Sequence, residues 1–398
     1  MYSRLVLFIV LLLALAKPYQ CFKSSPSGLV SSGLGVSKKM SGLVLNSDSI
    51  GAVGSKLTNK ELAFEGLAKF VDDDPSTVDM VPTTGGVNNI CQFVTLPNGE
   101  KYLLRIYNNG LDTTRVAFEH SVLKQLEGVE MSFKVPKFLP VKGQEGGSTF
   151  AELSNGAQAC LVEVIPGGLP KLTCVRDIGR ASGELNKQLG VVGANVDPAT
   201  CNCAPYWDMY AVHHAVTEEN LKATLQGAAF DGDLRPFADK ALADVLDITA
   251  KCERYRETLP VQLIHGDLHY DNVLVQDGKV TGLLDFEFAA FDWRALELAI
   301  CLSKYAGEPD AITYFDDFIE GYATTAVLTP EEARAVPELI NLRILSNVVY
   351  FVGRAVAGED DIASLTTRIQ MYCERVDWVK ANADRIANQV IEKMGLVV

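Results

Sequence analysis

The stretch that decides the fold reads LIHGDLHYDNVLVQDGKVTGLLDFEFAAFDW and runs from residue 263 to residue 293. Apolar runs at its start, middle and end predict strands that lie in a core. Between these runs stand side chains whose atoms can bind a metal ion or a proton: His265, Asp267, His269, Asp271, Asn272, Asp285, Glu287 and Asp292. Polar groups gathered beside buried strands indicate a functional site.

The centre of the stretch predicts a β-hairpin, because Asp277-Gly278 is a type I′ turn signal between two apolar runs. With these two residues as the loop, Gln276 pairs with Lys279. Counting back along both strands then places Asn272 opposite Leu283.

This register places Asp285 on the same face as Asn272, with the two Cα atoms roughly 7 Å apart. Glu287 continues on that face if the strand does. An amide and a carboxylate are hard oxygen ligands that suit Mg²⁺. Asp267 lies on the loop before the hairpin and remains free to accept or orient a proton, as phosphoryl transfer requires.

The two histidines of the stretch favour supporting roles. His265 and His269 are four residues apart, but Gly266 and the preceding strand argue against the helix that a zinc pair would need. We expect His265 to hold the loop through hydrogen bonds and His269 to face the cleft or the loop surface.

Short β-like runs alternate with one helix in residues 58–165, the expected small lobe, whereas helical patterns dominate residues 166–398. In the small lobe, Asn98-Gly99 predicts a hairpin. Gly85-Gly86 precedes its first strand, where backbone amides can approach a phosphate; an ordinary turn is the alternative.

A helix is expected from about Thr114 to Glu127, stopped by Gly128. Its apolar stripe includes Glu119, which needs a partner if it is buried. Arg105, in the preceding apolar strand, is the nearest candidate, unless both side chains reach solvent.

The apolar strand in residues 159–168 ends at Pro166 and two glycines, and it is placed to connect the lobes. A connector at a lobe boundary commonly lines the cleft, where its backbone can meet a flat heteroaromatic ligand.

The formal charge of −14 comes from 36 Lys and Arg against 50 Asp and Glu, without a basic block. This balance argues against nucleic acid or an anionic membrane as the main partner, and it suits a small cationic or zwitterionic substrate.

Residues 1–50 read as a targeting presequence. Arg4 precedes an apolar run from Leu5 to Ala16, typical of a signal peptide, and an acid-free, Ser-rich stretch from Lys17 to Asn46 is typical of a transit peptide. The two in series resemble the presequences of algal complex plastids, which imply delivery through the ER to the plastid stroma. Secretion is the alternative.

HGDLHYDN followed by LLDFE resembles the catalytic and metal-binding motifs of the aminoglycoside phosphotransferase and choline kinase superfamily. The resemblance implies an α+β, bilobal, protein-kinase-like fold, with a small antiparallel-sheet lobe that carries one helix and a larger, mainly helical lobe. It covers about Thr58 to Lys393, and it includes TTGGVNN as the phosphate-covering turn and LVEVIPGG as the hinge.

By this resemblance the protein is a small-molecule kinase that uses ATP and Mg²⁺. Asp267 is the catalytic residue, and Asn272 and Asp285 bind the metal. The implied nucleotide-binding residues are Gly85, Gly86, Arg105, Glu119, Glu163, Val164 and Ile165. Two positions depart from the common pattern: Arg105 stands where many members have Lys, and Glu297 where relatives commonly have Asp, which we interpret as a helix-capping variation.

The segment after the hairpin resembles the homoserine-kinase-like branch, and its Asp-Phe-Glu is also similar to choline kinases. Both branches imply a substrate with a hydroxyl and an amine. His269, Glu287, Asp292 and Trp293 are therefore the candidate substrate residues, the acids and the indole facing an ammonium group. Asp292 and Trp293 pack the loop in the alternative interpretation.

Other functions also stay open at this point. A choline, ethanolamine or aminoglycoside kinase is the alternative within the superfamily. A binuclear metallohydrolase would use His265, Asp267, His269 and Asp285, but it leaves Arg105 and Glu119 unexplained. A nucleotide-binding pseudokinase is the third hypothesis, although the catalytic and metal-binding side chains are all present.

Overall fold

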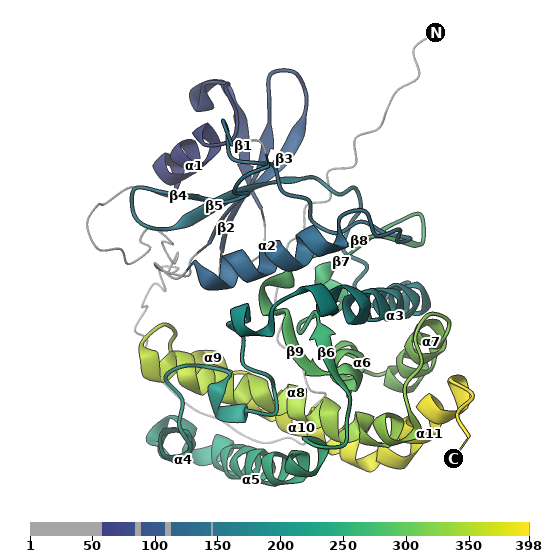
Figure 1. Cartoon of the computed structure of the whole chain (residues 1–398). Helices are drawn as coiled ribbons and strands as arrows, with labels where there is room; N and C mark the ends of the chain where they lie inside the picture. The colour runs from purple at the N-terminus through teal and green to yellow at the C-terminus, as the bar shows by residue number, and fades with distance from the viewer. Residues whose placement is uncertain (1–57, 84–88, 108–112, 145, 398) are drawn as a thin grey trace, which may run out of the picture.

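The computed structural model describes residues 58–83, 89–107, 113–144 and 146–397. Within them the protein has a small lobe built on a sheet and a larger helical lobe below it (Figure 1). The predicted bilobal α+β fold is thereby confirmed. The predicted presequence and the Gly85-Gly86 turn lie outside the described residues and stay predictions.

The sheet of the small lobe is antiparallel, in the order β1-β2-β3-β5-β4. Its strands are β1 (Asp79–Pro82), β2 (Asn89–Thr95), β3 (Lys101–Tyr107), β4 (Ala151–Glu152) and β5 (Gln158–Glu163). The predicted turn between β2 and β3 is confirmed, and Gly99 has a φ of 88° there, which favours glycine.

Two helices flank this sheet. α1 (Asn59–Ala68) begins at a capping box of Thr58 and Glu61 and buries Leu62 and Leu67 in the core of the small lobe. α2 (Thr114–Leu126) lies between the sheet and the large lobe (Figure 1), close to the bounds predicted for it. The sheet therefore meets the large lobe through α2.

The large lobe packs its helices around α8. Its helices are α3 (Val175–Val192), α4 (Glu218–Leu225), α5 (Arg235–Cys252), α6 (Arg294–Ser303), α7 (Ala311–Ala323), α8 (Pro330–Ala357), α9 (Ala363–Thr366), α10 (Ile369–Ala381) and α11 (Ala383–Lys393). By length and composition α8 is apolar enough to cross a membrane, yet 67% of its apolar window is buried inside the protein. It is a core helix, covered by α5, α6, α10 and α11.

Two short strand pairs support the stretch quoted at the outset. β6 (Val261–Ile264) pairs with β9 (Ala290–Trp293), and β7 (Val273–Gln276) pairs with β8 (Lys279–Leu283). Asp277 and Gly278 join β7 to β8 with φ values of 52° and 77°, as a type I′ turn requires. The predicted hairpin and its closing pair, Gln276 with Lys279, are confirmed.

The predicted register further along this hairpin is wrong. A bulge separates the pair of Val275 with Val280 from the pair of Leu274 with Gly282, so Val273 and not Asn272 lies opposite Leu283. One extra residue on β8 shifts every later pair.

Glu287 is expected to share a strand face with Asp285 only if the strand continues, and this condition is not met. β8 ends at Leu283, Asp285 has a left-handed φ of 69°, and Phe286–Phe288 form a 3-10 helix. The chain thus leaves the extended conformation before period-2 alternation can reach Glu287.

Candidate active site

The loop that carries Asp267 is fixed through its backbone. Glu297, in the first turn of α6, accepts hydrogen bonds from the N–H groups of His265 at 2.6 Å and Gly266 at 3.4 Å. Gly266 has a φ of 80°, and a Cβ there would lie 2.2 Å from the carbonyl oxygen of Phe288. The loop therefore needs a glycine here, and Glu297 binds this loop, which corrects its interpretation as a helix cap.

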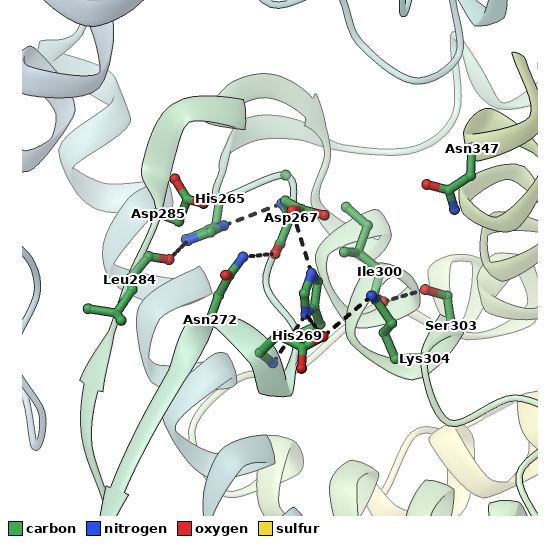
Figure 2. A network of polar contacts seen from close by, with 12 residues as sticks. His265, Asp267, His269, Asn272, Leu284, Asp285, Ile300, Ser303, Lys304 and Asn347 are labelled. Carbon is green, nitrogen blue, oxygen red and sulfur yellow. Dashed lines mark hydrogen bonds and ion pairs between the residues drawn. The ribbon is translucent and has the colours of Figure 1, made fainter. Parts of the chain in front are cut away.

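His265 holds the same loop, as predicted. Its Nδ1 accepts from the N–H of Asp267 at 3.3 Å, and its Nε2 lies 2.9 Å from the carbonyl oxygen of Leu284 (Figure 2). The ring is fully buried and burial lowers its pKa to about 4, so it stays neutral. Because both ring nitrogens are engaged, His265 is a poor metal ligand, which argues against the binuclear metallohydrolase.

Asp267 lies between two donors. Arg343 of α8 donates from Nη2 to Oδ1 at 2.6 Å, and Nε2 of His269 lies 3.5 Å from Oδ2. Although burial opposes ionisation, His269 and Arg343 hold the pKa of Asp267 well below its usual range. Asp267 is therefore a fixed carboxylate that suits the orientation of a hydroxyl group.

Sequence reasoning missed Arg343. It is a single cation in the apolar run LINLRILSNVVYF, and only 9% of its surface is exposed. A lone charge on the buried face of a helix needs a partner, and this signal could have pointed to an acidic group of the site.

His269 also joins Asp267 to the rim of the site. Its Nδ1 lies 3.3 Å from Asp271, and Asp271 lies 3.6 Å from Nζ of Lys304 at the end of α6. Figure 2 shows Lys304 reaching toward this loop from the side opposite Asp285. His269 therefore lies beside Asp267, and its expected position facing the cleft or the loop surface stays a prediction.

Asn272 and Asp285 point into the same region as Asp267 (Figure 2), in spite of the shifted register. Asn272 donates from Nδ2 to the carbonyl oxygen of Asp267 at 2.9 Å, so its Oδ1 is the atom available to a cation. Asp285 adds a carboxylate held in a left-handed conformation, a strained geometry common at functional sites. These hard oxygen donors fit Mg²⁺.

Arg105 of β3 joins three carboxylates. Its Nη1 donates to Glu119 at 3.0 Å, and its Nη2 donates to Asp285 at 3.0 Å and Glu287 at 2.8 Å. The predicted pair with Glu119 is confirmed. Burial raises the pKa of Glu119 to about 7, against the opposing effect of Arg105.

Glu287 therefore lies on the side of Arg105, where it also accepts from Asn89 Nδ2 at 2.9 Å. This corrects the expectation that it faces a substrate ammonium. Arg115 of α2 binds the Glu287 carbonyl oxygen at 3.1 Å and so links α2 to the same segment.

Asp292 and Trp293 also differ from the expectation that they face the substrate, because both are fully buried. Asp292 accepts from the N–H groups of Tyr206 and Trp293, at 2.6 Å each, while the indole packs against Trp207 and Tyr255. They support the segment that carries Tyr206, whose ring lies 5.4 Å from the guanidinium of Arg343. The alternative, packing of the loop, describes them correctly.

The hinge residues lie at the end of β5. The N–H of Glu163 binds the carbonyl oxygen of Lys137, and the next hydrogen bond to the backbone is at Pro166, whose carbonyl oxygen accepts from Thr281. Between these points, no hydrogen bond within the described residues engages the backbone of Val164 or Ile165. Ile165 packs over Gly282, where a Cβ would lie 2.7 Å from its side chain.

These features define a phosphotransferase of the protein-kinase-like type. Residues 80–336 match the phosphotransferase enzyme family (APH), and the chain belongs to that family. It is a small-molecule kinase.

Its relatives include two bacterial homoserine kinases. That of Acidiphilium cryptum is 26% identical over 285 residues, which cover 70% of this chain and 82% of the relative. That of Bradyrhizobium diazoefficiens is 28% identical over 258 residues, 64% of this chain and 72% of the relative.

Solved structures share the fold. A microcompartment-associated aminopropanol kinase has a TM-score of 0.55 at 15% identity, covering 83% of this chain and 98% of its own. An ethanolamine kinase of Plasmodium vivax has a TM-score of 0.55 at 16% identity, covering 82% and 88%.

The buried Glu297 predicts a pH-dependent stability. Burial raises its pKa to about 7, whereas an unfolded Glu titrates near 4.5, so its contribution is fully present below pH 4.5 and is lost as pH rises through 7. Glu297→Gln mimics the protonated acid. We expect the free energy of unfolding of this variant to fall less than that of the wild type between pH 5 and pH 7, by up to about 1.4 kcal/mol per pH unit, with no further difference in slope above pH 8.

Glu331→Gln, an exposed change at the start of α8, serves as the control and should parallel the wild type. Asp292, whose pKa burial also raises to about 7, remains in all three proteins, so the slope in Glu297→Gln is reduced and not abolished. If the free energies of unfolding of the wild type and Glu297→Gln change equally with pH between pH 5 and pH 7, Glu297 is not the group that titrates near pH 7.

Proposed function

We propose that this kinase transfers the γ-phosphoryl group of ATP to the side-chain hydroxyl of homoserine. The observation that carries the proposal is the position of Asp267, held between Arg343 and His269 beside the oxygen donors Asn272 and Asp285. The homoserine kinases among the relatives support the choice of acceptor.

In the proposed reaction, the substrate hydroxyl donates a hydrogen bond to Asp267, which aims the oxygen at the γ-phosphorus. A new O–P bond forms, the bond from the γ-phosphorus to the bridging oxygen breaks, and ADP leaves. Because His269 and Arg343 depress the pKa of Asp267, the carboxylate orients the hydroxyl and takes its proton only as the oxygen loses electron density.

Asn272 and Asp285 are the residues proposed to hold Mg²⁺, which neutralises the charge of the phosphates when bound. Arg105, which pairs with Asp285, is proposed to contact the phosphates of ATP. Val164 and Ile165 are proposed to present their backbone to adenine, with Glu163 at the start of this hinge.

The test is an acceptor screen with the full chain and radiolabelled ATP. Homoserine, choline, ethanolamine and an aminoglycoside are compared with and without EDTA. We expect transfer to homoserine, its loss with EDTA, and its return with excess Mg²⁺. Asp285→Asn should lower the rate at saturating Mg²⁺ by at least about 100-fold, because a carboxylate ligand is replaced by a neutral amide.

Asp277→Asn, an exposed change in the hairpin turn, is the matched control and should retain the wild-type rate. Preferred transfer to choline or ethanolamine would indicate a choline- or ethanolamine-type kinase instead. Nucleotide binding without transfer to any acceptor would support the pseudokinase and reject the proposal.

A further inference from the structure

The acceptor side of Asp267 carries cations, whereas the acids expected to bind an ammonium group are engaged elsewhere. Glu287 binds Arg105, and Asp292 is buried beneath Tyr206. The groups that approach Asp267 from the large lobe are instead Arg343 and Lys304.

The guanidinium of Arg343 has donors to spare. Its Nη1 donates to Asn347 at 2.7 Å and lies 3.5 Å from the hydroxyl of Ser346, while a single bond from Nη2 goes to Asp267. Among the residues that the structure describes, its buried Nε has no hydrogen-bond partner. A buried donor without an acceptor is costly, so the arrangement favours an anionic ligand at this position.

Lys304 adds a second cation on the same side. Its side chain is one-third exposed, and its pair with Asp271 is long, at 3.6 Å. Burial lowers its pKa, and Arg343 and Arg375 add to this effect while Asp271 and Asp267 oppose it. Lys304 and Arg343 therefore place two cationic side chains near Asp267, and both would attract an anionic group of a ligand.

We propose that Arg343, assisted by Lys304, binds a carboxylate group of the acceptor and thereby selects amino acids over simple amino alcohols. This inference rests on the proposed function and deepens it. Arg343 is suited to the role because a guanidinium can bind a carboxylate through two parallel N–H groups.

Arg343 also links recognition to catalysis. The same guanidinium that would bind the substrate carboxylate holds Oδ1 of Asp267 at 2.6 Å. An acceptor without the carboxylate leaves a buried cation partly unpaired and loses the contact that fixes its hydroxyl beside Asp267.

The experiment compares L-homoserine with 3-aminopropan-1-ol, which lacks only the carboxylate. In the wild-type enzyme we expect kcat/KM for homoserine to exceed that for the amino alcohol by about 100-fold or more. In Arg343→Met, both values fall because Asp267 loses a partner, but the ratio between them should also fall, to within about tenfold. Arg343→Lys retains the buried charge and keeps the test usable if Arg343→Met does not fold. It should raise KM for homoserine but not KM for 3-aminopropan-1-ol.

Arg354→Met is the matched control. Arg354 lies on the same helix, is 17% exposed and pairs with Asp360, so its loss should leave the ratio unchanged. Binding is measured separately: 4-hydroxybutanoate, which keeps the carboxylate but lacks the amine, should compete with homoserine in the wild type and not in Arg343→Met.

The outcomes separate the two proposals. An equal loss for both acceptors in Arg343→Met would make Arg343 a positioning residue for Asp267 and overturn carboxylate recognition. Equal wild-type efficiency toward both acceptors would overturn it too, while the kinase function stands. An enzyme that phosphorylates no acceptor would reject the proposed function itself.

Discussion

Asp267→Asn is expected to lower kcat for phosphoryl transfer by about 10³-fold. The amide keeps the size of the side chain but cannot accept the proton of the acceptor hydroxyl, and it weakens the charged bond from Arg343. The affinity for ATP should change little, because Asn272, Asp285 and Arg105 are untouched. Steady-state transfer to homoserine and nucleotide titration by calorimetry measure the two effects.

Asp271→Asn sharpens this test. Asp271 lies on the same loop, and its ion pairs within the described part of the chain are with His269 and Lys304 and not with Asp267. We expect a loss well below that of Asp267→Asn. Comparable activity of Asp267→Asn and wild type would contradict the catalytic assignment, and an equal loss in both variants would locate the effect in the loop as a whole.

Short sequence patterns predicted the turns and helix faces whose conformation depends on neighbouring residues in the chain. The type I′ turn at Asp277-Gly278 follows from residues that tolerate a positive φ, and Glu119 revealed itself as an acid on an apolar helix face. Its partner Arg105 was predictable because a buried charge must be paired, and the preceding strand offers the nearest cation.

The pairing register of the β7–β8 hairpin could not be predicted from short sequence patterns. A bulge within β8 is decided by contacts with distant segments: Thr281 binds the carbonyl oxygen of Pro166, and Lys134 pairs with Thr281 and Leu283. None of these partners can be seen from the hairpin sequence. Asn272 and Asp285 still point into one site because Asp285 turns out of the strand.

The residues expected or proposed to contact the substrate were the least predictable for a related reason. Asp292 and Trp293 lie close to the motif in sequence, but β9 pairs with β6 inside the lobe and buries both. Arg343 lies 76 residues from Asp267 and reaches it only because α8 runs through the centre of the large lobe. Residues that recognise a substrate often come from such distant elements, and one sequence does not show which elements meet.

Arg105→Met is expected to lower the free energy of unfolding by about 3–5 kcal/mol and to abolish measurable ATP binding. The side chain of Arg105 is 11% exposed and joins Glu119, Asp285 and Glu287, which would be left close together without a cation. Because those acids can be neutralised by protonation, the defect should be smaller at pH 5 than at pH 8. Chemical denaturation at both pH values and nucleotide titration measure these effects.

Arg105→Lys tests why the chain has arginine at this position. The planar fork places Nη1 on Glu119 and Nη2 on Asp285 and Glu287, whereas a single ammonium cannot reach all three acids at 2.8–3.0 Å with the same geometry. We expect an intermediate loss of stability and weaker ATP binding. Lys101→Met, an exposed change on the same strand, should leave both unchanged. If Arg105→Lys matches the wild type in both stability and ATP binding, a positive charge at this position is sufficient for both, and the planar guanidinium geometry is not required.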